Sequence, residues 1–319
     1  MHRFPIAIAA AFLALVAFAA PAQQLRVVAT TGMIADVVTN VAGDRAEVVQ
    51  LMRPGIDPHL YKPTRSDIRR LMDADIIFYN GLLLEGKMTD ALIRAATAGK
   101  AVHAVTELIE DDRLLEPDEF EGLADPHLWM DPTLWAETVS VVQEKLGDAD
   151  PDNASTYAEN AQAYKDQLFR LDAYAERVLG TVPEASRVLV TAHDAFNYFG
   201  SRYGFELVGI QGVSTESEAG VRDIARIAQL LVDRKVSAVF VESTVSARSV
   251  QAVIAGARAK GHDVSLGGEL FSDAMGEAGT YEGTYIGMID HNVTTIARSL
   301  GGEAPEAGMS GALSNQAND

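Results

Sequence analysis

The sequence has 319 residues, of which 48% are hydrophobic and 22% charged, with a formal net charge of −19. This length allows two domains with separate cores, and the composition is that of a globular protein. The negative charge argues against a nucleic-acid partner, because phosphate binding needs a basic face.

The first residues have the pattern of a secretory signal peptide. Arg3 supplies a short positive segment, Phe4–Ala20 is apolar, and Ala22 ends a run of small residues that suits a signal peptidase. The alternative is a transmembrane anchor, for which the run is short and lacks a basic cluster behind it. We therefore predict a signal peptide over residues 1–22, cleaved after Ala22, and a periplasmic protein.

The sequence contains no cysteine. An exported protein without disulfides depends on its core for stability. A lipid-modified N-terminus needs a cysteine at the cleavage site, so we expect no lipid anchor. Any metal site has to use His, Asp, Glu or backbone groups, because no thiolate is available.

Short apolar runs alternate with helical stretches over residues 23–152 and again over residues 181–300. The runs are rich in Val, Ile and Leu and seldom alternate with polar residues, as is typical of strands buried on both faces. This order predicts an α/β fold with two lobes, each a mostly parallel sheet flanked by helices. The predicted strands are Leu25–Ala29, Ala46–Met52, Ile76–Tyr79, Ala101–Val105, Arg187–Thr191, Phe205–Ile210, Val236–Val241 and Asp263–Leu266.

Residues 153–180, between the two sets, carry one narrow apolar stripe from Tyr157 to Val178 with steps of four and three residues. Pro151 precedes this segment and Gly180 follows it, as is typical of helix ends. The helix would be about 40 Å long and would join the lobes rigidly; the alternative is a surface helix within one domain. Residues 301–319 are rich in small and polar residues, which predicts a flexible tail.

Three histidines lie where strands or loops give way to helices. His59 lies in a loop beyond Ala46–Met52, His127 lies between two prolines, and His193 follows Arg187–Thr191. In open parallel sheets, ligands bind in the crevice beyond the carboxyl ends of the strands. The proline before His59 and before His127 restricts the backbone and fixes the direction of the imidazole. These three side chains are candidate metal ligands.

A carboxylate is the natural fourth ligand, and position favours Asp273. It follows the last predicted strand, so it lies on the same side of the crevice as His193. Glu242, at the end of Val236–Val241, is the next candidate, although a hydrogen-bonding role beside the ligands fits it better.

Other polar residues carry less weight. Asp131 and Asp194 are further candidates for orienting the imidazoles, with a solvated surface position as the alternative. His103, His262 and His291 are interpreted as structural or surface residues, because most lone histidines are.

The order of these segments resembles the solute-binding proteins of metal ABC transporters, the cluster A-I family that takes up zinc, manganese or ferrous iron. The resemblance covers nearly all of the chain after the signal peptide. The matching stretches are Pro58-His59-Leu60-Tyr61 with Pro63 and Asp67, Tyr79-Asn80-Gly81 with Leu84-Glu85, Asp125-Pro126-His127-Leu128-Trp129-Met130-Asp131-Pro132, Ala192-His193-Asp194-Ala195-Phe196-Asn197-Tyr198-Phe199 with Tyr203-Gly204, and Gly268-Glu269-Leu270-Phe271-Ser272-Asp273.

The resemblance implies a ligand set of His59, His127, His193 and Asp273, two residues from each lobe. It also implies two α/β lobes joined by one long helix, one Zn²⁺ or Mn²⁺ per chain as cargo, and delivery to a membrane permease. We expect a monomer without enzymatic activity.

Two departures bear on the metal. Zinc-specific members commonly carry a long histidine- and acid-rich loop before the second ligand, whereas the stretch Glu110–Ala124 is short and has no histidine. Many manganese-specific members use Glu as the third ligand, where this chain has His193. The chain is most similar to the subgroup that takes both metals. Nitrogen-rich sites bind Zn²⁺ more tightly than Mn²⁺.

Three other functions are alternatives. A zinc hydrolase typically has three protein ligands and an open position for water, and four protein ligands argue against it. A surface adhesin has no independent support in the sequence. A receptor for a non-metal solute on the same fold would tolerate loss of His59 or His127.

Overall fold

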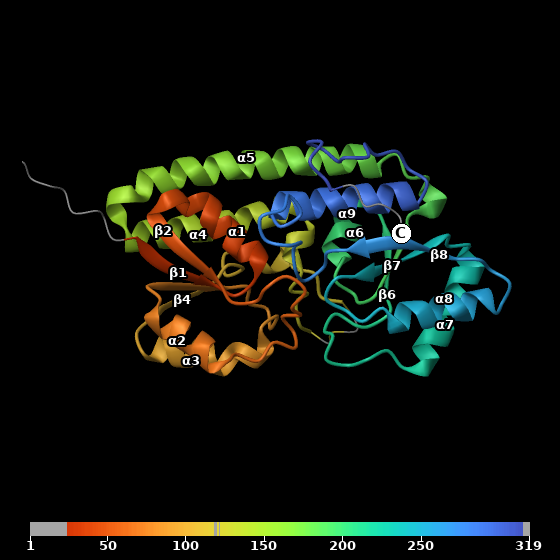
Figure 1. Cartoon of the computed structure of the whole chain (residues 1–319), viewed down its shortest axis with the longest axis horizontal. Helices are drawn as coiled ribbons and strands as arrows, with labels where there is room; N and C mark the ends of the chain where they lie inside the picture. The colour runs from red at the N-terminus through yellow and green to blue at the C-terminus, as the bar shows by residue number, and fades with distance from the viewer. Residues whose placement is uncertain (1–23, 118–119, 121, 315–319) are drawn as a thin grey trace, which may run out of the picture.

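The computed structural model describes residues 24–117, 120 and 122–314, so the predicted signal peptide lies outside the described residues. Two α/β lobes lie side by side, and one long helix, α5 (Ala154–Leu179), runs along both of them (Figure 1). Within the described residues, no helix is both long enough and apolar enough to cross a membrane.

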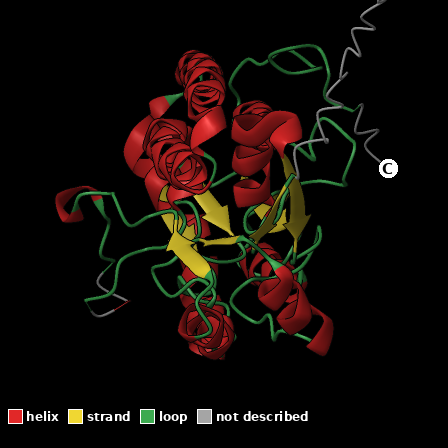
Figure 2. Cartoon of the chain, turned by 90° about the vertical axis from the view of Figure 1, so that its left-hand side faces the viewer, coloured by secondary structure: helices red, strands yellow, loops and turns green. Residues whose placement is uncertain are grey.

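The N-terminal lobe contains a four-stranded parallel sheet in the order β2-β1-β3-β4. Helices α1 and α4 cover one face, and α2 and α3 cover the other (Figures 1 and 2). The elements are β1 Leu25–Ala29, α1 Gly32–Ala42, β2 Ala46–Gln50, α2 Arg65–Asp73, β3 Ile76–Tyr79, α3 Thr89–Thr97, β4 Ala101–Ala104 and α4 Pro132–Ala149.

The C-terminal lobe contains two parallel strand pairs, β5-β6 and β7-β8, with β5 next to β7. Helices α6 and α9 lie on the same side as α5, whereas α7 and α8 cover the opposite side (Figure 1). The elements are β5 Val188–Thr191, α6 Asn197–Tyr203, β6 Glu206–Gly209, α7 Val221–Arg234, β7 Ala238–Glu242, α8 Arg248–Arg258, β8 Ser265–Leu270 and α9 Tyr285–Ser299. The predicted α/β fold with mostly parallel sheets is confirmed, and strand ends differ from the predictions by a few residues.

Single 3-10 turns connect several of these elements. They are η1 Gly43–Arg45, η2 Gly86–Met88, η3 Asp111–Arg113, η5 Leu128–Met130, η6 Pro151–Asn153 and η7 Glu184–Ser186.

Helix α5 has 26 residues, and its predicted apolar stripe is buried from Tyr157 to Val178. The stripe faces α1 and α4 in the first lobe and α9 in the second. The expectation of one long helix that joins the lobes is therefore confirmed, and the alternative of a helix confined to one domain is wrong.

One apolar core continues through both lobes beneath α5. It includes Val38 of α1, Leu168 of α5 and Phe199 of α6, all fully buried. Within this core the rings of Trp135 and Tyr285, from different lobes, stack with centroids 6.0 Å apart and an interplanar angle of 23°. Smaller clusters fill the space under α2 and α3 and under α7 and α8. The shared core joins the two lobes along α5.

The chain after α9 differs from the predicted flexible tail. Its residues up to Ser314 form turns against the second lobe. The backbone N–H of Met309 donates to the buried carboxylate of Asp290 at 2.8 Å, and that of Ser314 donates to Glu282 at 2.7 Å. The composition of the tail does not reveal these contacts, in which its backbone N–H groups donate to buried carboxylates of the second lobe. Residues 315–319 lie outside the described residues.

Candidate metal centre

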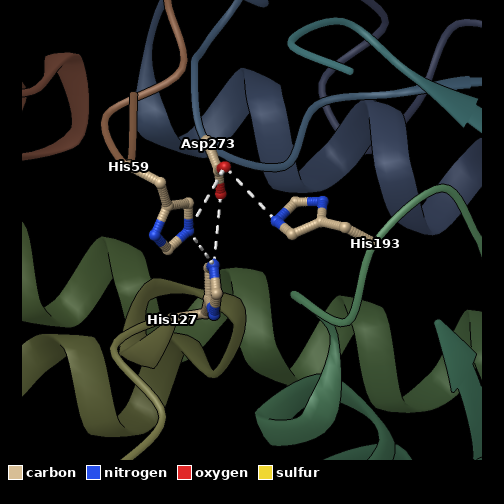
Figure 3. Close-up of side chains that lie close together, drawn as sticks. All are labelled: His59, His127, His193 and Asp273. Atoms are coloured by element: carbon tan, nitrogen blue, oxygen red, sulfur yellow. Dashed lines mark hydrogen bonds and ion pairs between the residues drawn. The ribbon is translucent and has the colours of Figure 1, made fainter. Parts of the chain in front are cut away.

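The structure brings together the four side chains that the sequence singled out. His59 lies in the loop after β2, His127 directly precedes η5, His193 follows β5, and Asp273 follows β8. These segments meet between the lobes, and the three rings and the carboxylate point toward one another (Figure 3). All four residues are buried, and their ligand atoms lie within 4.8 Å of one another.

The spacing of the atoms is that of a ligand set around one ion. The Nε2 atoms of His59 and His127 are 3.3 Å apart. The carboxylate of Asp273 lies 3.3 Å from Nε2 of His127, 3.3 Å from Nε2 of His193 and 3.8 Å from Nε2 of His59. The Asp273 oxygens and His193 Nε2 have no hydrogen bond of ordinary geometry within the described residues. Buried polar atoms normally have partners, so this arrangement suits a bound cation.

Two copies of an Asp-Pro-His sequence shape the loops of the first lobe. The backbone N–H of His59 donates to Oδ1 of Asp57 at 2.8 Å, and that of His127 donates to Oδ1 of Asp125 at 2.9 Å. Such Asx turns, with proline between the two residues, hold the loop without regular secondary structure. Asp125 Oδ1 also lies 2.6 Å from Nδ1 of His127, so Nε2 is left to face the site.

Glu242 has the same function for His193. Its carboxylate accepts the backbone N–H of His193 at 2.9 Å and hydrogen-bonds to Nδ1 of the ring. A carboxylate on the second nitrogen fixes the tautomer and direction of an imidazole ligand. The hydrogen-bonding role expected for Glu242 is confirmed.

A loop of the first lobe, after β3, supports the segment that carries His127. The buried carboxylate of Glu85 accepts the backbone N–H of Asn80 at 2.7 Å and the hydroxyl of Thr30 at 2.6 Å. Asn80 in turn donates from Nδ2 to the carbonyl of Pro126 at 3.0 Å. The Tyr79-Asn80-Gly81 and Leu84-Glu85 stretches therefore position the residue that precedes a candidate ligand.

Burial and the neighbouring rings act together on the first histidine. Burial, helped by the charges of His127 and His193, outweighs the attraction of Asp273 and lowers the pKa of His59 to about 3. His59 is therefore neutral at pH 7 and offers a free lone pair.

The pKa values of the other two histidines, His127 and His193, are raised instead of lowered. Burial alone would lower the pKa of His127, but the carboxylates of Asp125 and Asp273 outweigh it and raise that pKa to about 9. Glu242 and Asp273 outweigh burial in the same way and raise the pKa of His193 well above its usual value. Burial would raise the pKa of Asp273, but the two rings hold it well below its usual value. A divalent ion here would replace two protons.

Asp131 and Asp194 are the other predicted candidates for orienting the imidazoles. Asp131 caps α4, accepting the backbone N–H of Thr133 at 2.8 Å, so the orienting role considered for it is wrong. Asp194 follows His193, and its backbone N–H donates to the Gly212 carbonyl at 3.3 Å; its orienting role remains a prediction.

The three histidines set aside in the sequence lie away from the site. His103 is half-buried in β4, His262 Nε2 lies 2.7 Å from the Val236 carbonyl, and His291 Nε2 lies 2.9 Å from the Glu269 carbonyl. Sequence reasoning overlooked Asp57 and Asp125. The repeated Asp-Pro-His pattern was the signal that could have identified both.

Two α/β lobes that enclose a buried group of three imidazoles and a carboxylate define a two-lobed solute-binding protein whose site can hold one metal ion. The model of a protein family described as "Zinc-uptake complex component A periplasmic" matches residues 27–299, and the chain belongs to this family. The resemblance noted in the sequence is thereby confirmed.

Individual relatives agree with this assignment. The chain is 47% identical over 278 residues to the manganese-binding lipoprotein MntA of Bacillus subtilis, covering 87% of this chain and 90% of that protein. It is 47% identical over 274 residues to the zinc-binding protein TroA of Treponema pallidum, covering 86% and 88%. The solved structure of that periplasmic zinc-binding protein matches with a TM-score of 0.84 at 46% identity, over 87% of this chain and 99% of the other. Fe(III)-bound YtgA from Chlamydia trachomatis matches with a TM-score of 0.79 at 29% identity, over 88% and 99%.

Proposed function

We propose that this protein captures one divalent transition-metal ion between its lobes and delivers it to an ABC transporter permease for import. His59, His127, His193 and Asp273 are the proposed ligands. The observation that carries the proposal is the convergence of three imidazole Nε2 atoms and one carboxylate in a buried site, where the Asp273 oxygens lack ordinary hydrogen-bond donors among the described residues.

Zn²⁺ is the ion that we expect the isolated protein to bind most tightly. Three nitrogens and one carboxylate favour Zn²⁺ over Mn²⁺ in the usual affinity order. Bidentate binding by Asp273 would raise the coordination number and help Mn²⁺. The names of the relatives include manganese, zinc and iron(III), which supports a transition metal without choosing one.

We further propose a monomer that is free in the periplasm once residues 1–22 have been removed. Several relatives are named lipoproteins, whereas this sequence has no cysteine to carry a lipid. The proposed lobes are residues 23–152 and 181–300, with residues 153–180 as the connection. A buried site with four protein ligands leaves no open position for a catalytic water, which supports a binding protein rather than a hydrolase.

The proposal is tested by calorimetric titration of the metal-stripped mature chain, starting at Gln23, with Zn²⁺ and separately with Mn²⁺. We expect one ion per chain, tight binding of at least one metal, and loss of that binding in His127→Ala. His262→Ala is the matched control, because His262 lies outside the site. Absence of binding in the unmodified chain, or equal binding by His127→Ala, would reject the ligand assignment.

A further inference from the structure

The aspartate of each Asp-Pro-His loop also makes a hydrogen bond to the C-terminal lobe. Oδ1 of each aspartate is bonded to the histidine that follows it, and Oδ2 is bonded to a side chain of the C-terminal lobe. Thr215 donates from Oγ1 to Oδ2 of Asp57 at 2.5 Å, and Asn197 donates from Nδ2 to Oδ2 of Asp125 at 3.0 Å. In each loop, the aspartate carboxylate thus joins a proposed ligand to the opposite lobe.

These contacts are partly buried and connect distant parts of the chain. Asp125 is fully buried and Thr215 is 8% exposed. The paired residues are 158 and 72 positions apart in the sequence. Hydrogen bonds to a carboxylate are stronger than those between neutral groups, and screening by water weakens them little when they are buried.

His193 is held differently. Its partner Glu242 belongs to the same lobe, so its direction does not depend on how the lobes face each other. His59 and His127, by contrast, are held by carboxylates that also need the second lobe in place. The two ligands of the first lobe are therefore the ones coupled to closure.

We infer that Thr215 and Asn197 are latches, positioning residues that hold the lobes closed around the metal and slow its release. The inference rests on the proposed metal-binding function. Both latches form only when the lobes face each other as they do here, so they raise the fraction of molecules in the closed arrangement. A ligand that needs the closed state binds more tightly in proportion to that fraction. Neither residue is a proposed ligand, so the latches act through Asp57 and Asp125.

The test measures metal release. Protein loaded with Zn²⁺ is mixed with an excess of a chromophoric chelator in a stopped-flow instrument, for the unmodified chain and for Thr215→Val and Asn197→Ala. We expect each variant to release zinc about tenfold faster, as loss of a hydrogen bond to a charged group predicts. Association should change less than about twofold, because most changes in affinity among related complexes lie in release.

Matched controls separate a latch from a general structural effect. Thr138→Val removes a buried hydroxyl that bonds within α4, and Asn160→Ala removes a side chain that bonds to Val41. Both should release zinc at the unmodified rate. The visible spectrum of the Co²⁺-loaded Thr215 and Asn197 variants should match that of the unmodified chain, because all four ligands remain. Thr215→Ser keeps the hydroxyl and should restore slow release.

One further variant guards against misfolding. Asn197→Asp keeps the shape of the side chain but places a second carboxylate against Asp125, and we expect faster release than for Asn197→Ala. Unchanged release in Thr215→Val and Asn197→Ala, or slow release in Asn197→Asp, would overturn the latches while leaving the proposed function intact. An unmodified chain that binds no metal would instead reject the proposed function.

Discussion

Glu242 and His193, which lie 49 residues apart, are joined twice: one carboxylate oxygen accepts the backbone N–H of His193 and the other bonds to Nδ1 of its ring. The first bond fixes the position of the loop and the second fixes the rotation of the imidazole. Nε2 is then the only ring nitrogen left for an ion.

Glu242→Gln should weaken zinc binding about 10–100-fold, the usual effect of losing the carboxylate behind a histidine ligand. The amide keeps the shape but donates as well as accepts, and it loses the negative charge. Competition with a chelator of known affinity measures the change. Glu47→Gln, on an exposed residue of β2, is the control. Equal affinity in Glu242→Gln and in the control would contradict the orienting role.

Zinc binding at pH 7 should release about two protons. In the metal-free site the pKa of His127 is about 9 and that of His193 lies well above 6.5, so both rings are protonated, whereas His59, with a pKa of about 3, is neutral. The ion needs neutral rings, so lowering the pH strengthens competition by protons and weakens binding.

Between pH 7 and pH 6 the affinity should therefore fall about a hundredfold, tenfold for each displaced proton. Calorimetry in two buffers of different ionisation enthalpy counts the protons directly. A binding enthalpy that is the same in both buffers would show that no protons are displaced.

Leu168→Ala should lower the free energy of unfolding by about 2–5 kcal/mol, because it leaves a cavity in the shared core. Leu168 is fully buried on α5. Its neighbour Phe169 is 48% exposed, so Phe169→Ala should cost about 1 kcal/mol or less. Urea unfolding followed by circular dichroism compares the two. Similar losses for both variants would mean that α5 does not bury the predicted face.

Gly200→Ala should destabilise the protein by about 1–3 kcal/mol through overpacking. An added Cβ would overlap the Leu207 side chain and lie 2.8 Å from the carbonyl oxygen of Phe205. Gly212→Ala is the matched control, because a Cβ there meets no atom of the described part of the chain within 4 Å. Thermal unfolding of the metal-free proteins measures both, and an unchanged midpoint for Gly200→Ala would show that α6 can move away from β6.

Much of the fold could be predicted from local patterns. The runs at Leu25–Ala29 and Ile76–Tyr79 are strands with the predicted bounds, because apolar residues without alternation suit strands covered on both faces. The stripe on α5 was visible because helical spacing is regular. The positions of the proposed ligands followed from one rule, that the carboxyl ends of parallel strands face a common crevice.

Contacts between distant segments left no such signal. Nothing in the sequence around Thr215 or Asn197 indicates that each side chain meets an aspartate of the other lobe, since that pairing depends on how the lobes pack. The last turns of the chain were predicted as flexible for the same reason. Their composition is polar, and the carboxylate of Asp290 that binds Met309 is buried only in the folded lobe.

The shared core has a consequence for when the site comes into existence. The proposed ligands extend from residue 59 to residue 273, and neither lobe completes the core or the ligand set without the other. A chain that stops before His193 carries two of the three histidines and should bind Zn²⁺ weakly, which titration of such a truncated chain would check. The proposed site is therefore complete only after both lobes have folded against each other. The compartment in which the chain completes its fold, rather than the one in which it is synthesised, determines the metal pool that it samples.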